Sequence, residues 1–442
     1  MRVKFSVPLL LLAVLSWTSP LQAKESPDEL ARIAVSEDAK AASVAIAKLR
    51  CLGPAGLETM MRVHASRIDQ QIKTPQAALD PDWPRLSDAL DAVSQQKNSY
   101  LSGLYWYTDF GQAKAAAKKS GKPILSLRLL GNLNEEFSCA NSRFFRTILY
   151  SNQSISQILR DQFVLHWKSV RPAPRVTIDF GDGHKLERTL TGNSIHYILD
   201  TEGRPIEALP GLYGPAAFLR ALLASEKVFA TLQQEGGPNP AQRLLTYHRE
   251  RIQRLNANWL NDIEKTGGTA PKELRVVRRP DGTPEALSIA QLAIVKMVTE
   301  ATILRSFTSI GDSLGKITDE SAWRRIAELH RSDANLDSQS IGLISRQTQK
   351  VFAGDGSRVV HEEGLKNLID KLQMNIALDT VRNEYLMRTK LYAWLIEDRG
   401  RSDLETFNEK VYAELFLTPA SDPWLGLFTP DTYVALEGGG IK

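Results

Sequence analysis

The sequence has very little cysteine and almost no excess of charge of one sign. Only 2 of its 442 residues are cysteine, too few for a disulfide framework or a four-thiolate metal site. The net charge is +4, from 55 basic and 51 acidic residues. The sequence has no cluster of basic residues of the kind that binds the phosphate backbone of nucleic acids. Nucleic acid is therefore not an expected partner.

Long apolar runs are also missing beyond the N-terminus. There, an apolar run of about a dozen residues follows Arg2 and Lys4, and the small Ala23 ends a short cleavage region. The run is shorter than the roughly 20 apolar residues that span a bilayer. We therefore expect residues 1–23 to be a cleaved signal peptide. The mature chain is then exported, periplasmic or secreted, with no integral membrane span.

The rest of the sequence has the composition of an ordinary globular protein, with 43% hydrophobic and 24% charged residues. Residues 24–100 have apolar residues at helical spacing, whereas residues 101–225 alternate strand-like and helical runs. Residues 226–442 return to helical spacing and end in a Pro- and Gly-rich tail. The pattern predicts an α+β, mostly helical fold, with a central α/β domain between an N-terminal and a larger C-terminal helical region.

The central region carries the strongest alternation of elements. Its expected strands are residues 123–130, 163–170, 176–180 and 194–199, and its expected helices are residues 112–119, 142–150, 154–161 and 215–225. Gly181-Asp182-Gly183 is typical of a hairpin turn. We therefore expect a hairpin insert at about residues 171–193, between two strands of the sheet.

Short motifs in this region follow the order found in a known fold. The matching residues are Trp106, Lys122-Pro123, Cys139-x-x-Ser142, Phe163-Val164, and Ile198-Leu199-Asp200 with Gly203. On these residues the region resembles a thioredoxin-like domain. The resemblance implies a reactive thiol at a helix N-terminus, where the helix dipole and free amide groups lower the pKa of the thiol.

The sequence departs from that family at the residues that do its chemistry. The family uses two thiols separated by two residues, but the second position here is Ser142, which cannot resolve a mixed disulfide. The family also has a cis-proline opposite the cysteine, and Gly192-Asn193-Ser194 stands in its place. The resemblance therefore implies a degenerate C-x-x-S member, with Asn193 and Ser194 as candidate neighbours of Cys139.

Three interpretations of Cys139 remain open at this point. It is a buried or capping residue of a redox-silent module, or a monothiol nucleophile with Ser142 as its hydrogen-bonding neighbour. The third interpretation is a disulfide with Cys51, which requires Cα atoms within about 7 Å of each other. Cys51 itself lies on the apolar side of a predicted helix, so we expect it to be a small buried residue.

Two of the seven histidines, His166 and His196, fall on predicted central strands. If they lie near Cys139, an imidazolium ion would lower the pKa of the thiol. The alternative is that each is a hydrogen-bonded histidine of the core. No two histidines have the H-x-x-x-H spacing of a metal site on a helix, and we expect neither a metal nor a cofactor.

The sequence supports two functional hypotheses of different classes. The first is a redox-silent binding or scaffolding module of the cell envelope, with a protein partner that the sequence does not identify. The second is a thioredoxin-like enzyme for disulfide exchange or isomerisation that uses Cys139 alone, with Ser142 beside it. The missing second thiol favours the first hypothesis.

Overall fold

The computed structural model describes residues 25–73, 80–190, 193–234, 239–272, 276–279, 282–284, 288, 292, 319–353, 362–399, 402–425 and 435–437. The predicted signal peptide, residues 1–23, lies outside these ranges, as does much of the C-terminal tail. The described residues are mostly helical and include a five-stranded mixed sheet, so the predicted α+β, mostly helical class is confirmed. None of the helices formed by these residues has the length and apolar character needed to cross a membrane.

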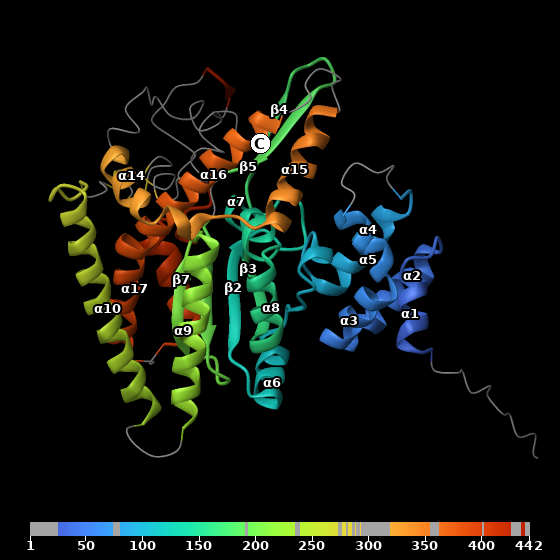
Figure 1. Cartoon of the computed structure of the whole chain (residues 1–442), viewed down its shortest axis with the longest axis horizontal. Coiled ribbons are helices and arrows are strands. Elements are labelled where there is room, and N and C mark those ends of the chain that lie inside the picture. The colour runs from blue at the N-terminus through green and yellow to red at the C-terminus, as the bar shows by residue number, and fades with distance from the viewer. Residues whose placement is uncertain are drawn as a thin grey trace, which may run out of the picture.

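The central sheet has the strand order β1-β3-β2-β6-β7. Its strands are β1 (Trp106–Tyr107), β2 (Ile124–Leu130), β3 (Val164–Arg171), β6 (Ile195–Leu199) and β7 (Pro205–Pro210). β1 and β2 run parallel to β3, whereas β6 is antiparallel to β2 and β7 is antiparallel to β6. Every residue of β2 and β6 is buried, which fits strands in the middle of a covered sheet (Figure 1).

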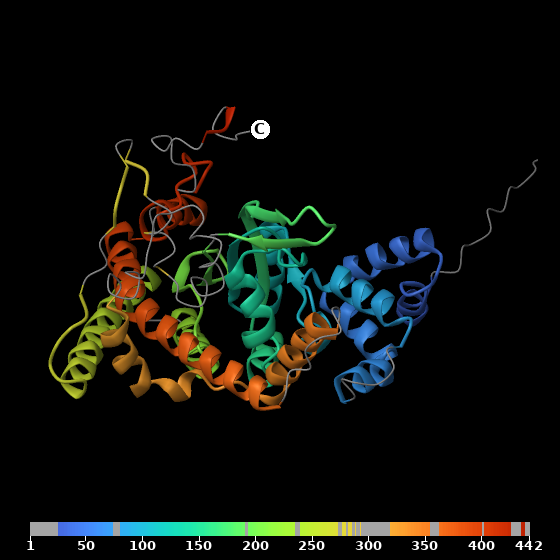
Figure 2. The ribbon, with the colours of Figure 1, turned by 90° about the horizontal axis from the view of Figure 1, so that it is seen from above.

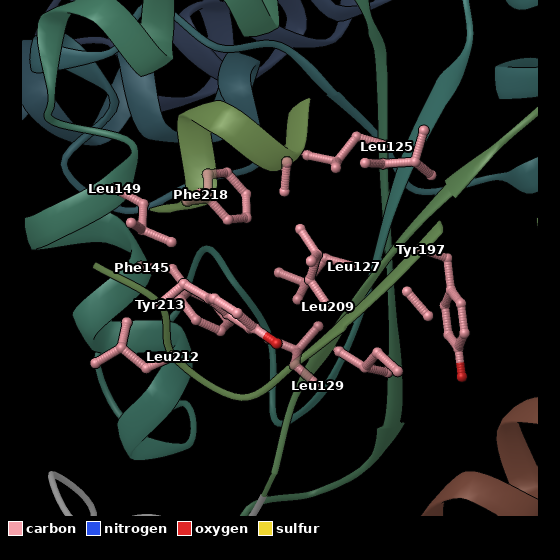
Figure 3. Close-up of a cluster of buried hydrophobic side chains, with 14 of the residues drawn as sticks. Leu125, Leu127, Leu129, Phe145, Leu149, Tyr197, Leu209, Leu212, Tyr213 and Phe218 are labelled. Atoms are coloured by element: carbon pink, nitrogen blue, oxygen red, sulfur yellow. The ribbon is translucent and has the colours of Figure 1, made fainter. Parts of the chain in front are cut away.

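The register gives the sheet two chemically different faces. Ser126 pairs with His166 on one side and with Tyr197 on the other, so these three side chains share one face. Figure 3 shows Tyr197 on the opposite side of the strands from Phe145 and Phe218. The face toward Phe145 and Phe218 is apolar, and the face of Ser126 carries polar side chains.

Four helical segments pack around this sheet. They are α6 (Phe110–Ser120), α7 (Ala140–Phe144) with its π-helical continuation η2 (Phe145–Leu149), α8 (Gln153–Gln162) and α9 (Pro215–Gln233). The Asp109 side chain caps α6 by accepting a hydrogen bond from the amide of Gln112, and Gly121 ends that helix with a φ of 69°. Local sequence signals therefore fix both ends of α6.

Residues 175–189 form a separate hairpin. β4 (Arg175–Asp179) pairs antiparallel with β5 (Lys185–Thr189). Gly181 and Gly183 in the turn have φ values of 77° and 98°, which L-amino acids with side chains rarely adopt. The hairpin projects away from the central sheet (Figure 2).

The N-terminal helices pack around a hydrophobic core of their own. They are α1 (Pro27–Ile33), α2 (Ala39–Cys51), α3 (Pro54–Val63), α4 (Ala65–Lys73) and α5 (Trp83–Ser94), and η1 (Ser99–Leu101) follows them. Cys51 is exposed, so the expectation that it is buried is wrong. Ala45 and Leu49 form the buried side of α2, and a helical residue two positions beyond Leu49 points away from that side.

The C-terminal helices share one continuous hydrophobic core with the sheet. They are α10 (Pro240–Lys265), α14 (Glu320–Leu329), η3 (Arg331–Ala334), α15 (Ser338–Ala353), α16 (Glu362–Arg382), η4 (Asn383–Arg388), α17 (Thr389–Asp398), α18 (Leu404–Lys410) and η5 (Val411–Leu415). α10 packs against α17, and α14 packs against α16. This shared core brings C-terminal side chains onto the surface of the sheet region that holds Cys139.

Candidate functional site

Cys139 lies at the start of α7, directly beyond the end of the central strand β2. Its backbone amide donates a hydrogen bond of 3.1 Å to the carbonyl of Leu130, the last residue of β2. The residue has no exposed surface and belongs to the main hydrophobic core. The thiol is therefore held in a fixed place that solvent does not reach.

Serine hydroxyls surround the thiol. The Sγ of Cys139 lies 3.1 Å from the Oγ of Ser194 and 3.5 Å from the Oγ of Ser142. The Ser142 hydroxyl in turn lies 2.7 Å from the Oγ of Ser138 and 2.8 Å from the Cys139 carbonyl. All three serines are buried. The polar contacts of the thiol are therefore hydroxyl groups, and a hydroxyl cannot form a disulfide with it.

The C-terminal segment closes the site from outside the sheet. The Tyr412 hydroxyl, from η5, donates a hydrogen bond of 2.8 Å to the carbonyl of Asn193, next to Ser194. The Asn193 side-chain amide donates to the carbonyl of Phe416 at 3.5 Å. Burial, together with the nearby Cys139, raises the pKa of Tyr412 well above its usual value, so this hydroxyl keeps its proton. Tyr412 and Phe416 are buried.

The base of the hairpin and the end of β3 reinforce this closure. Thr189 donates a hydrogen bond of 3.3 Å to the Ser138 carbonyl and accepts one of 2.9 Å from Arg143. The Arg171 guanidinium donates to the carbonyls of Thr418 and Asp422, at 3.3 and 3.1 Å. Hydrogen bonds at several separate points therefore hold the C-terminal segment and the base of the hairpin in place over Cys139.

The two histidines on central strands do not take part in the thiol site. His166 lies on the polar face, with its Nδ1 atom 2.8 Å from the Ser126 hydroxyl and 3.3 Å from Arg128. Burial first, and then the charges of Arg128 and Lys168, lower the pKa of His166 to about 3. A neutral ring at this position cannot stabilise a thiolate by its charge.

His196 lies on the opposite, apolar face. Its Nε2 atom is 2.6 Å from the hydroxyl of Tyr150, and its ring packs 4.5 Å from the ring of Phe145, centroid to centroid. Burial lowers the pKa of His196 to about 3. Strand alternation sends the two rings to opposite faces of the sheet, and each is the hydrogen-bonded core histidine of the alternative interpretation.

The two cysteines do not form a disulfide with each other. Cys51 is a free, exposed residue of the N-terminal helices, and Cys139 is free and buried. Of the residues expected around Cys139, the structure brings together Ser142, Ser194 and the backbone of Asn193. Ser138 and Tyr412 also belong to this group. Sequence reasoning missed Tyr412, because nothing in a helical spacing pattern tells which distant surface the helix covers.

Two buried charged residues were not predicted from the sequence either, although each stands as a single charge within an apolar run. Arg128 interrupts an apolar run in β2 and has no exposed side-chain surface, yet it pairs with Glu405 of α18 at 2.8 Å. Glu207 interrupts the apolar run of β7 and pairs with Arg388 of η4 at 2.7 Å. A single charge in a buried strand requires a partner, and here both partners come from the C-terminal helices.

The Glu207 ion pair is part of a larger buried cluster. The hydroxyls of Tyr392 and Tyr247 donate to Glu207 at 2.6 and 2.8 Å. Burial opposes ionisation of Glu207, but the charges of Arg388 and Arg251 outweigh it and lower its pKa to about 2. The cluster therefore holds a carboxylate that stays ionised inside the protein and joins the sheet to the C-terminal helices.

Comparison with known protein families, with curated proteins and with solved structures finds no match to this chain. Function is therefore inferred from the geometry of the site. That geometry is a buried single thiol among hydroxyl groups, closed by the C-terminal segment, with no second thiol beside it.

Proposed function

We propose that the protein is an exported binding or scaffolding protein of the cell envelope, with a redox-silent thioredoxin-like domain at its centre. The strand order β1-β3-β2-β6-β7 and the position of Cys139 at a helix start beyond β2 support the thioredoxin-like assignment. Fold alone does not establish an activity. The redox-silent part of the proposal depends on the surroundings of the thiol.

The observation that carries the proposal is the complete burial of Cys139 between Ser142 and Ser194. Disulfide exchange requires a thiolate to approach a sulfur of the substrate, so both the access and the ionisation of the thiol matter. Here the thiol has no exposed surface, and both histidines in the sheet are held neutral by their lowered pKa values. The thiol therefore lacks the access that exchange requires, and neither histidine supplies a positive charge to activate it.

A projecting hairpin supports the binding part of the proposal. Phe180, at the end of β4 and beside the turn, is 61% exposed. The hairpin extends away from the sheet (Figure 2), and its two strands pair only with each other among the described residues. An apolar side chain and free strand edges in a projecting element are suited to contact with another protein.

Thiol labelling tests the redox-silent assignment directly. In a Cys51→Ala variant Cys139 is the only thiol, and we expect no reaction with a disulfide reagent in native buffer and complete reaction in denaturant. A Cys139→Ala variant is the matched control, since the exposed Cys51 should react at once in native buffer. Rapid native labelling of Cys139, with reduction of insulin disulfides, would overturn the assignment.

One observation favours a second candidate, a monothiol exchange enzyme. Cys139 stands at the start of α7 and has a hydroxyl 3.1 Å from its sulfur, and a hydroxyl donor can stabilise a thiolate. This activity requires the C-terminal segment to move away from the thiol. Exchange activity in the full chain that disappears in Cys139→Ala would establish it in place of the first candidate.

A further inference from the structure

A pocket of about 300 Å³, whose lining does not include Cys139, lies between α9, α10, η3, α16 and η4. α9 and α10 lie beside each other in both views of the ribbon (Figures 1 and 2). One wall of the pocket is apolar and includes Ala217, Ala221 and Leu255. The other walls carry charged side chains, so the pocket offers both apolar surface and polar groups, as ligand sites do.

Positive charge exceeds negative charge on the pocket walls. Four arginines line it, against the two carboxylates of Asp333 and Glu384. The arginines are Arg220, Arg251, Arg254 and Arg388. The surplus indicates an anionic ligand, because guanidinium groups bind carboxylate and phosphate oxygens well.

Most of these arginines already have protein partners, which identifies the one that is available. Arg220 makes two bonds of 2.6 Å to Asp333, and Arg388 pairs with Glu207. The Nε atom of Arg251 donates to the Tyr392 hydroxyl at 3.1 Å and lies 4.0 Å from Glu207. Arg254 is exposed and has no ion pair within the described parts of the chain. It lies three residues after Arg251, on the same face of α10. Arg254, with Arg251 beside it, is therefore the group placed to bind an anion.

Glu384 offers a second, complementary contact. Its Oε1 atom accepts a hydrogen bond from Arg388 at 2.5 Å, whereas its Oε2 atom is buried and has no hydrogen-bond partner. A buried carboxylate oxygen without a donor is unfavourable. A ligand that donates a hydrogen bond to Oε2 would satisfy it.

We propose that this pocket binds a small organic acid that also carries a hydroxyl or amino group. The carboxylate of the ligand contacts Arg254 and Arg251, and its donor group contacts the free oxygen of Glu384. The short apolar side chains of α9 accept the carbon skeleton. A volume of about 300 Å³ is at the small end for ligand pockets, which favours a compact hydroxy or amino acid over a nucleotide.

Calorimetric titration of the full-length protein tests the proposal, with three probes at matched ionic strength. L-Serine and D-glycerate carry both groups, and propionate carries the carboxylate alone. We expect saturable binding of L-serine or D-glycerate at concentrations up to about 10 mM, and binding of propionate about tenfold weaker. Absence of binding by all three, or equal binding of propionate, overturns the proposal.

Two pairs of variants place the binding in this pocket. Arg254→Gln should weaken binding about tenfold, whereas Arg249→Gln, an exposed arginine of the same helix outside the pocket, should not. Ala224→Leu narrows the pocket without a change in charge and should also weaken binding, while Ala230→Leu, exposed on the same helix, should not. Binding that is unchanged in both Arg254→Gln and Ala224→Leu overturns the proposal.

Discussion

The Sγ of Cys139 lies 3.1 Å from the Oγ of Ser194, although 55 positions separate the two residues in the chain. β6 begins directly after Ser194 and pairs with β2, at whose end Cys139 is fixed. The contact thus follows from the pairing of these two strands. In a dithiol enzyme the thiol would need an accessible thiol partner, and here it has a buried hydroxyl.

Removal of the C-terminal cover should expose Cys139. In a Cys51→Ala background, we expect Tyr412→Ala to raise the native labelling rate of Cys139 about tenfold or more, since about 1.4 kcal/mol of local opening energy corresponds to a factor of ten. Stopped-flow labelling measures the rate. Tyr412→Phe keeps the ring and serves as the control. Equal rates in Tyr412→Ala and the parent would contradict the role assigned to Tyr412.

Loss of the Cys139 side chain should affect stability and little else. We expect Cys139→Ala to lower the free energy of unfolding by about 1 kcal/mol, because a small buried group and its hydroxyl contact are lost. Urea denaturation followed by circular dichroism measures the change. Cys51→Ala, at an exposed position, should alter stability by less than about 0.5 kcal/mol. An equal loss in the two variants would contradict the packing described for Cys139.

Glu207 should be important for stability. We expect Glu207→Gln to lower the free energy of unfolding by about 3 kcal/mol, because the buried Arg388 loses one of its two carboxylate partners and keeps only Glu384. Glu202→Gln, on an exposed residue of the preceding turn, is the control and should cost under about 1 kcal/mol. Urea midpoints at neutral pH compare the two, and similar midpoints would show that the ion pair contributes little.

The same carboxylate should also shape the acid stability of the protein. The pKa of Glu207 is lowered from 4.5 to about 2 in the folded protein, so the folded state favours the ionised form. Its stabilising contribution is complete above pH 4.5 and is lost as the pH falls through about 2. Urea unfolding between neutral pH and pH 2 should therefore show a smaller decrease for Glu207→Gln than for the parent. Parallel curves would contradict this prediction.

His166 and His196 should remain neutral well below neutral pH. The pKa of each is lowered to about 3, and burial is the largest cause for both. We expect their ring proton resonances not to titrate between pH 8 and pH 5, with assignments from His166→Gln and His196→Gln spectra. Because unfolded histidines bind protons below about pH 6.5, each ring costs stability as the pH falls from about 6.5 toward 3. Titration of either ring near pH 6.5 would contradict its burial.

Export can be tested on the expressed chain. If residues 1–23 are the signal peptide that we propose, the mature protein recovered from a bacterial periplasmic extract should begin at Lys24, because the charged start, apolar run and small residue at position 23 match the pattern of a cleaved signal. Intact-mass measurement gives the N-terminus. Recovery of the full-length chain from the cytosolic fraction alone would contradict export.

Much of the sheet was predictable from the sequence, since buried strands appear as apolar runs. The runs at residues 123–130 and 194–199 contain β2 and β6, because strands buried on both faces leave few polar positions. Both ends of α6 could also be predicted from the sequence, since the Asp109 side chain caps the start of the helix and Gly121 ends it. Structure that depends on contacts within one segment can therefore be predicted from the residues of that segment.

The surroundings of the candidate site were less predictable. Which face of the sheet His166 and His196 occupy could not be predicted, because it depends on their register with Ser126 and Leu127 of β2, the strand between them. The sequence is enough to identify Arg128 and Glu207 as charged residues in buried strands, but it does not identify their partners. Glu405 lies 277 positions from Arg128, and Arg388 lies 181 positions from Glu207. A local sequence pattern cannot identify a partner that far along the chain.

The sequence by itself determined that only one thiol, Cys139, stands at the C-x-x-S motif, and therefore that no disulfide can form within it. This conclusion needs only residue identity, because serine has no sulfur. The tertiary structure alone decided that the thiol is buried, that Ser194 is its neighbour and that Tyr412 helps to close the site. Burial depends on which distant helix covers a surface, and that is set by the packing of the whole core.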